Sequence, residues 1–173
     1  MKRLCGFILS FVWIIISIQA KETTLVIYST NDMHGSINNF AKIAKFIENE
    51  RKKYPHTLLL NGGDIFSGNP VVDQYPQRGK PMIELMNAVG YQYATFGNHE
   101  FDFGQQALKQ CMNQADFEWI CANMEVDPST AVIKQPQPYV TLKMGDIKIC
   151  ILGLIETSKT FQGQPITSAH PDY

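Results

Sequence analysis

Short apolar runs alternate along this chain with segments whose apolar residues recur at helical spacing. The runs at Thr24–Ser29 and Thr57–Leu60 are rich in strand-forming residues, as expected of buried strands. Between them, apolar residues recur at helical spacing from Phe40 to Lys53, and Pro55 ends the helix that this pattern predicts. These segments therefore form a strand–helix–strand unit.

The same alternation continues through the rest of the chain. Pro81 suits the first turn of a helix that continues to Val89. We expect further elements at Tyr91–Phe96 (strand), Phe103–Gln114 (helix) and Glu118–Ala122 (strand), then a hairpin of two strands, Tyr139–Lys143 and Ile147–Ile155. This order predicts an α/β fold, in which a mixed, mainly parallel sheet is flanked by helices and the late hairpin adds antiparallel pairing.

Composition and charge narrow the class of protein. With 173 residues, of which 45% are hydrophobic and 18% charged, the chain can bury the core of one ordinary globular domain. Its formal net charge of −1 gives no basic field that would attract nucleic acid. A small anionic substrate would need local positive charge instead, which a bound metal ion can supply.

Residues 1–20 have the pattern of a signal peptide, in which a short basic start precedes the apolar run Leu4–Ile18 and Ala20 follows. The run is short for a membrane span. We therefore expect cleavage after Ala20 and a periplasmic or secreted mature chain, residues 21–173. An uncleaved anchor is the alternative, and only in that case would the protein contact a membrane.

The cysteines do not indicate a disulfide framework. Cleavage would leave Cys111, Cys121 and Cys150, which is an odd number, and none of them forms a Cys-x-x-Cys pair. Cys121 and Cys150 lie within apolar runs that read as buried strands. We expect all three to be small core residues rather than metal ligands.

The predicted chemistry lies at the ends of three successive strands. The first strand ends in a turn with Asp32 and His34, the second in a turn with Asp64, and the third in a turn with Asn98 and His99. In open α/β sheets, ligands gather at the carboxyl ends of the strands. Separate turns can therefore bring oxygen and imidazole ligands to one place, and the two carboxylate oxygens of Asp64 can bridge two cations.

Such a ligand set suits hydrolysis of a phosphate ester. Two metal ions about 3.5–4 Å apart stabilise both the attacking and the leaving oxygen of a phosphoryl displacement, and they lower the pKa of a bound water. A mixed set of carboxylate, imidazole and amide ligands suits manganese, zinc or iron, and its oxygen-rich character leaves magnesium open.

The segments Asn31–Gly35, Gly62–Asp64 and Gly97–Glu100 together resemble the motifs of calcineurin-type metallophosphoesterases. The longer forms Thr30–Gly35 and Gly97–Gly104 are similar to the 5′-nucleotidase branch, which includes bacterial periplasmic enzymes that also hydrolyse UDP-sugars and cyclic nucleotides. The resemblance implies a metallophosphatase-type α/β/β/α sandwich, incomplete in this chain. It also implies two divalent metal ions and attack by a metal-bound hydroxide.

The resemblance also implies roles for single residues. Asp32 and His34 would bind the first metal ion, Asp64 would bridge, and Asn98 would bind the second. The catalytic residues would be His99 and Asp102: His99 stabilises the transition state, and Asp102 orients His99. Glu100 would either hold the turn or lie behind the ligands. From the place of Asn69 in Gly68-Asn69-Pro70, soon after Asp64, we expect a turn role, with contact to substrate as the alternative.

The chain departs from the family after the third motif. Family members supply two further metal-binding histidines downstream, whereas His170 is the only histidine after His99 and its surroundings match neither downstream motif. The resemblance also implies a C-terminal nucleoside-binding domain, for which we expect no counterpart in these residues. We therefore expect residues 21–173 to be the N-terminal part of a metallophosphoesterase domain, either a fragment or one part of a split protein. Alone, it should bind metal weakly and turn over slowly or not at all.

The leading functional prediction is an exported, metal-dependent hydrolase of nucleoside 5′-monophosphates. One alternative is a phosphodiesterase that acts on cyclic nucleotides or UDP-sugars, because the metal core is common to both activities. Another alternative, from a different class, is a non-catalytic metal-binding remnant. The partners expected are a nucleotide or another phosphate ester and, for a split enzyme, the missing C-terminal segment.

Overall fold

The computed structural model describes residues 22–129 and 131–156. The predicted signal peptide (residues 1–20) and His170 lie outside the described residues. Within the described ranges, no helix combines the length and the apolar character that crossing a membrane requires.

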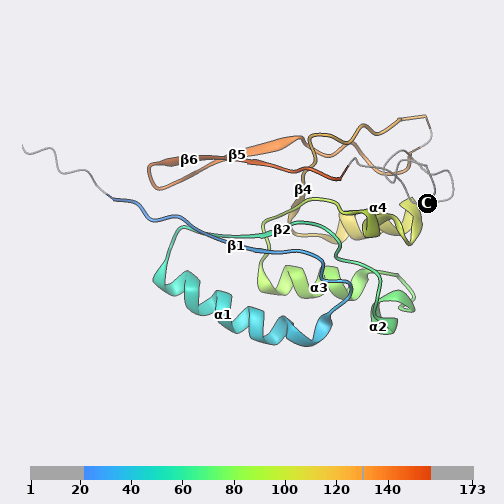
Figure 1. Ribbon diagram of the computed structural model, residues 1–173, viewed down its shortest axis with the longest axis horizontal. Helices are drawn as coiled ribbons and strands as arrows, with labels where there is room; N and C mark the ends of the chain where they lie inside the picture. Colours follow the sequence, from blue (N-terminus) through green and yellow to red (C-terminus); the bar gives the residue numbers. More distant parts are fainter. Residues whose placement is uncertain (1–21, 130, 157–173) are drawn as a thin grey trace, which may run out of the picture.

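A parallel sheet with the strand order β1-β2-β3-β4 forms the centre of the fold (Figure 1). β1 and β2 are in register over their whole length, from Val26 opposite Thr57 to Thr30 opposite Asn61. The sheet confirms the predicted α/β class with mainly parallel pairing. Its strands are β1 (Val26–Thr30), β2 (Thr57–Asn61), β3 (Tyr93–Ala94) and β4 (Glu118–Trp119).

Helices cover one face of this sheet. α1 (Phe40–Lys53) and α3 (Lys80–Val89) lie side by side beneath β1 and β2 (Figure 1). The bounds of α1 are those that the apolar pattern predicts. The remaining helical segments are α2 (Pro70–Asp73), α4 (Gly104–Gln114) and the 3₁₀ turns η1 (Ile37–Asn39) and η2 (Asn98–Phe101).

The core lies between the sheet and these helices. On β2, Leu58 and Leu59 are fully buried although they point to opposite faces, so this strand is covered on both sides. From α3, Met82, Ile83 and Met86 are also fully buried. The core therefore holds β2 rigidly, and with it the turn that follows β2.

A separate hairpin, β5 (Tyr139–Met144) and β6 (Ile147–Leu152), lies on the side of the sheet away from α1 and α3 (Figure 1). Its two strands pair antiparallel, as predicted. Cys150 corrects one expectation: it is exposed, because it shares the outward face of β6 with Lys148 and Leu152. Cys111 and Cys121 are buried, as expected.

β3 and β4 are shorter than predicted, for different reasons. β3 starts late because Gly90, at φ 80°, ends α3, and the Tyr91 N–H still bonds back to the Met86 carbonyl at 3.2 Å. β4 ends early because the chain changes partner: the Cys121 N–H bonds to the Gln137 carbonyl at 2.8 Å, next to the hairpin.

Candidate metal centre

The turns that follow β1 and β2 stay paired beyond the sheet. The Asp32 N–H donates to the Gly63 carbonyl (3.1 Å), and the His34 N–H donates to the Asp64 carbonyl (3.0 Å). The Gly35 N–H then donates to the carbonyl of Ile65 (2.9 Å). Two polar turns, which would be mobile if each stood alone, are therefore fixed to each other by backbone hydrogen bonds.

The backbone of this region is strained. Among the described residues other than glycine, only four have a positive φ: Asp32 (51°), His34 (44°), Asp64 (54°) and Ser67 (56°). The left-handed conformation costs about 1–2 kcal/mol for an ordinary residue and persists where the surroundings enforce it. Strain of this kind concentrates at functional sites.

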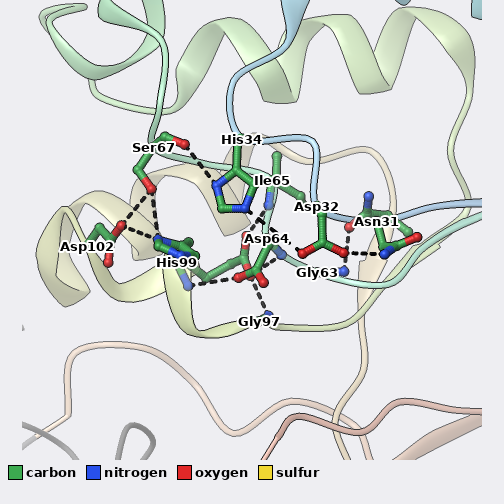
Figure 2. A network of polar contacts seen from close by, with 12 residues as sticks. Asn31, Asp32, His34, Gly63, Asp64, Ile65, Ser67, Gly97, His99 and Asp102 are labelled. Carbon is green, nitrogen blue, oxygen red and sulfur yellow. Dashed lines mark hydrogen bonds and ion pairs between the residues drawn. The ribbon is translucent and has the colours of Figure 1, made fainter. Parts of the chain in front are cut away.

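Three of these four residues bring ligand atoms together. One ligand atom each from Asp32, His34 and Asp64 lies within 4.8 Å of the other two, although the residues come from the turns after two different strands (Figure 2). The His34 Nε2 atom is 4.0 Å from Asp32 Oδ1. The Asp32 side chain is 61% exposed, so this edge of the sheet is open to solvent. Two carboxylates and an imidazole fit a divalent transition metal ion.

The third motif packs directly against the second. There is no space for a Cβ atom on Gly63, which faces the backbone of Gly97, or on Gly97, which faces the Asp64 carboxylate. The N–H of His99 donates to Asp64 Oδ1 at 2.9 Å. Asn98 lies on this turn between Gly97 and His99, the two residues that contact the Asp64 carboxylate.

Glu100 is a buried carboxylate that joins the two turns. Its side chain is 1% exposed and accepts the N–H groups of Asp64 (2.9 Å), Ile65 (2.7 Å) and Gly97. Burial raises the pKa of the Glu100 carboxyl to about 6, although the three N–H groups act in the opposite direction. Glu100 thus holds the turn, which is one of the two places that sequence reasoning allowed for it.

His99 and Asp102 form a hydrogen-bonded pair. His99 Nδ1 lies 2.7 Å from Asp102 Oδ2, and the ring of His99 packs edge-on against the ring of His34 at 4.6 Å between centroids. Burial alone would lower the pKa of His99, but the hydrogen bond and the charge of Asp102 outweigh it and raise that pKa above the ordinary histidine value. The structure therefore places this pair beside the candidate metal ligands.

Sequence reasoning missed Ser67. Its hydroxyl lies 2.6 Å from Asp102 Oδ2 and 3.1 Å from His99 Nδ1, and its carbonyl oxygen lies 3.1 Å from His34 Nδ1 (Figure 2). No short motif marks this serine, and only its position between Asp64 and the next helix could have drawn attention to it.

Asn69 occupies the turn role. Its side chain accepts the Val71 N–H at 3.0 Å, which caps the N-terminus of α2, and it donates to the Gly35 carbonyl at 2.9 Å. Both polar ends of the amide are thus engaged in holding the loop.

The fold and the site define a class of protein, namely an α/β protein that gathers metal-type ligands at the carboxyl edge of a parallel sheet. The chain belongs to the calcineurin-like phosphoesterase family, whose model matches residues 25–165. The family and the relatives that match the chain are phosphoester hydrolases. This agrees with the resemblance that the three motifs carry.

Individual relatives cover the chain well. The 5′-nucleotidase of Bos taurus is 28% identical over 86% of this chain, and a 2′,3′-cyclic-nucleotide 2′-phosphodiesterase/3′-nucleotidase of Haemophilus influenzae is 28% identical over 60% of it. The solved structure of the Haemophilus influenzae NAD nucleotidase matches 76% of the chain with a TM-score of 0.68 and 28% identity.

The reverse coverage is small. The chain spans 29% of the bovine relative, 19% of the cyclic-nucleotide phosphodiesterase and 26% of the NAD nucleotidase chain. The activities of those whole proteins therefore enter only as a basis for proposals about this chain.

Proposed function

We propose that this chain carries metal ligands of a two-metal phosphoesterase site, and that nucleoside 5′-monophosphates are its substrate class. The observation that carries the proposal is the convergence of Asp32, His34 and Asp64, whose ligand atoms lie within 4.8 Å of one another on strained backbone. The name of the bovine relative, a 5′-nucleotidase, supports this substrate class.

Each residue of the site has its own role. Asp32, His34 and Asp64 would hold one metal ion, and Asp64 and Asn98 would hold a second. Divalent metal ions bound there would neutralise charge on the phosphoryl oxygens and lower the pKa of water. Asp64 is well suited to the bridging position, because β2 and the Glu100 carboxylate fix its backbone.

His99 acts on the ester from the adjacent turn. A carboxylate oxygen can only accept, so the proton of the 2.7 Å contact with Asp102 sits on His99 Nδ1. Nε2 then remains to face the substrate. When the ring is protonated, it donates a hydrogen bond to the charge that develops in the transition state, and it can protonate the leaving oxygen. The carboxylate of Asp102 favours that protonated form.

The N-terminal residues point to the compartment. The basic start and apolar run of residues 1–20 support export by a signal peptide and a periplasmic or secreted site of action. Because this segment lies outside the described residues, the support comes from sequence alone. N-terminal sequencing of protein recovered outside the cytoplasm would test it, and a mature chain that still begins at Met1 would contradict cleavage.

A second candidate activity is hydrolysis of phosphodiesters. The name of the Haemophilus influenzae relative, a cyclic-nucleotide phosphodiesterase and nucleotidase, favours it. Purified chain loaded with manganese should be assayed with AMP, 2′,3′-cyclic AMP and a UDP-sugar, with His99→Gln as the control for contaminating activity. Release of phosphate from AMP that His99→Gln abolishes supports the nucleotidase. Hydrolysis of only the other substrates would contradict it.

A further inference from the structure

Ser67 makes contacts that no role assigned so far requires. Its hydroxyl reaches the Asp102 carboxylate at 2.6 Å, while its own carbonyl oxygen lies 3.1 Å from the ring of His34. One residue thus contacts a candidate metal ligand on one side and the His99–Asp102 pair on the other. Figure 2 shows the contacts of Ser67 with His34, His99 and Asp102.

The Ser67 hydroxyl donates its proton to the Asp102 carboxylate. Asp102 Oδ2 can only accept, so the Ser67 hydroxyl donates to it. The same oxygen accepts the proton of His99 Nδ1 at 2.7 Å, and the serine oxygen lies 3.1 Å from that nitrogen. The three polar atoms form a closed triangle, which restricts the carboxylate and, through it, the imidazole ring.

The carbonyl of Ser67 determines the tautomer of His34. A carbonyl oxygen can only accept, so the proton of the 3.1 Å contact sits on His34 Nδ1. The lone pair of His34 Nε2 is then free and faces Asp32, as binding a metal ion requires.

The loop that carries Ser67 is held on both sides. The preceding Phe66 is 1% exposed and packs against Phe103, with ring centroids 6.1 Å apart. Two residues later, the Asn69 amide is bonded to the Gly35 carbonyl and the Val71 N–H. Ser67 itself has φ 56°, a conformation that glycine would adopt without strain, so the hydroxyl is what a serine adds at this position.

We propose that Ser67 is a positioning residue of this site: its hydroxyl orients Asp102 and thereby His99, and its carbonyl orients His34. The proposal rests on the proposed function, because the purpose of this positioning is that His99 acts on a phosphate ester. Its test does not depend on that function, because the test measures the hydrogen bonds of Ser67 rather than hydrolysis.

The test is the exchange rate of the imidazole Nδ1–H protons. Chain labelled with ¹⁵N-histidine and held in a chelator gives separate signals for His34 and His99, assigned with His34→Gln and His99→Gln. Ser67→Ala should speed exchange of the His99 Nδ1–H about tenfold, the factor that corresponds to one hydrogen bond to a charged group. The His34 Nδ1–H should keep its rate, because the carbonyl of residue 67 remains.

Two further variants make the test decisive. Ser67→Gly removes the same hydroxyl and relieves the strained φ, so it should fold even if Ser67→Ala does not, and it should show the same fast exchange at His99. Ser129→Ala is the matched control, because the Ser129 hydroxyl also donates to an aspartate, Asp127, at 2.7 Å but in an exposed turn. It should leave both histidines unchanged.

Either of two results would overturn the proposal. If the rate at His99 in Ser67→Gly equals that of Ser129→Ala, the hydroxyl does not position the pair. If the Nδ1–H protons of both His34 and His99 exchange faster in both Ser67 variants, Ser67 only supports the loop. Failure of the proposed function is a separate outcome, since it would show as hydrolysis of 2′,3′-cyclic AMP or the UDP-sugar with AMP left intact.

Discussion

At the scale of single residues, the site is defined by where strain and ligand chemistry coincide. Asp32, His34 and Asp64 each combine a positive φ with a ligand atom directed at the other two. The sequence indicates the ligands, because their motifs are adjacent to predicted strands. It does not indicate the strain, which is set by backbone hydrogen bonds between turns that are about thirty residues apart, as between His34 and Asp64.

The Glu100 carboxylate should be essential to the stability of these turns. The two carboxylate oxygens of Glu100 together accept three N–H groups. Glu100→Gln replaces one of these oxygens with an amide NH₂ group, so at least one buried N–H loses its acceptor. We expect a loss of about 1–3 kcal/mol in the free energy of unfolding, measured by urea denaturation at a pH well above 6. The control is Glu48→Gln on the exposed face of α1, which should leave the free energy unchanged. Equal stabilities of the two variants would contradict the role of Glu100.

The pKa of His99 should depend on Asp102. Asp102 raises that pKa by its hydrogen bond and its charge, so Asp102→Asn should lower it, as measured by NMR titration of metal-free chain. Because the folded-state pKa is raised above 6.5, the pair stabilises the fold at pH below 6.5, and this contribution is lost as the pH rises through the raised value. Asp116→Asn serves as the control. An unchanged pKa in Asp102→Asn would contradict the pairing.

At the scale of elements, local pattern predicts long helices well and strand ends poorly. The bounds of α1 follow from apolar spacing and from Pro55, which are local properties. β4 ends at Trp119 because the next residues pair near Gln137, a non-local exchange that apolarity does not encode. The short helix α2 was not predicted, since its four residues are too few for periodicity and depend on the cap from Asn69.

Pairing between the two motif turns should be visible in amide hydrogen exchange. The N–H groups of Asp32, His34 and Gly35 lie beyond the end of β1 but bond to the turn after β2. We expect them to exchange at rates close to those of amides within β1, and far below the rates of the unfolded chain in urea. Exchange at the unfolded rate would show that the turns are not joined before metal binds.

At the scale of the whole molecule, the topology explains why the candidate ligands meet. Parallel strands in the order β1-β2-β3 send all their carboxyl ends to one edge, so three motifs spaced over some seventy residues of sequence become neighbours. The family match covers residues 25–165, which includes all three motifs. This much was predictable from sequence. The place of Ser67 was not, because it depends on how the loop after β2 folds back across the third motif.

The central claim is that Asp32, His34 and Asp64 bind divalent metal together, and direct titration of manganese tests it. Purified chain should be titrated with Mn²⁺ and the free ion followed by electron paramagnetic resonance, with circular dichroism to verify folding. Asp64→Ala should reduce binding most, because it removes the proposed bridge, Asp32→Ala should reduce it less, and Asp146→Ala in the hairpin turn should leave it unchanged. Manganese binding by folded Asp64→Ala equal to that of the Asp146→Ala control would contradict the account.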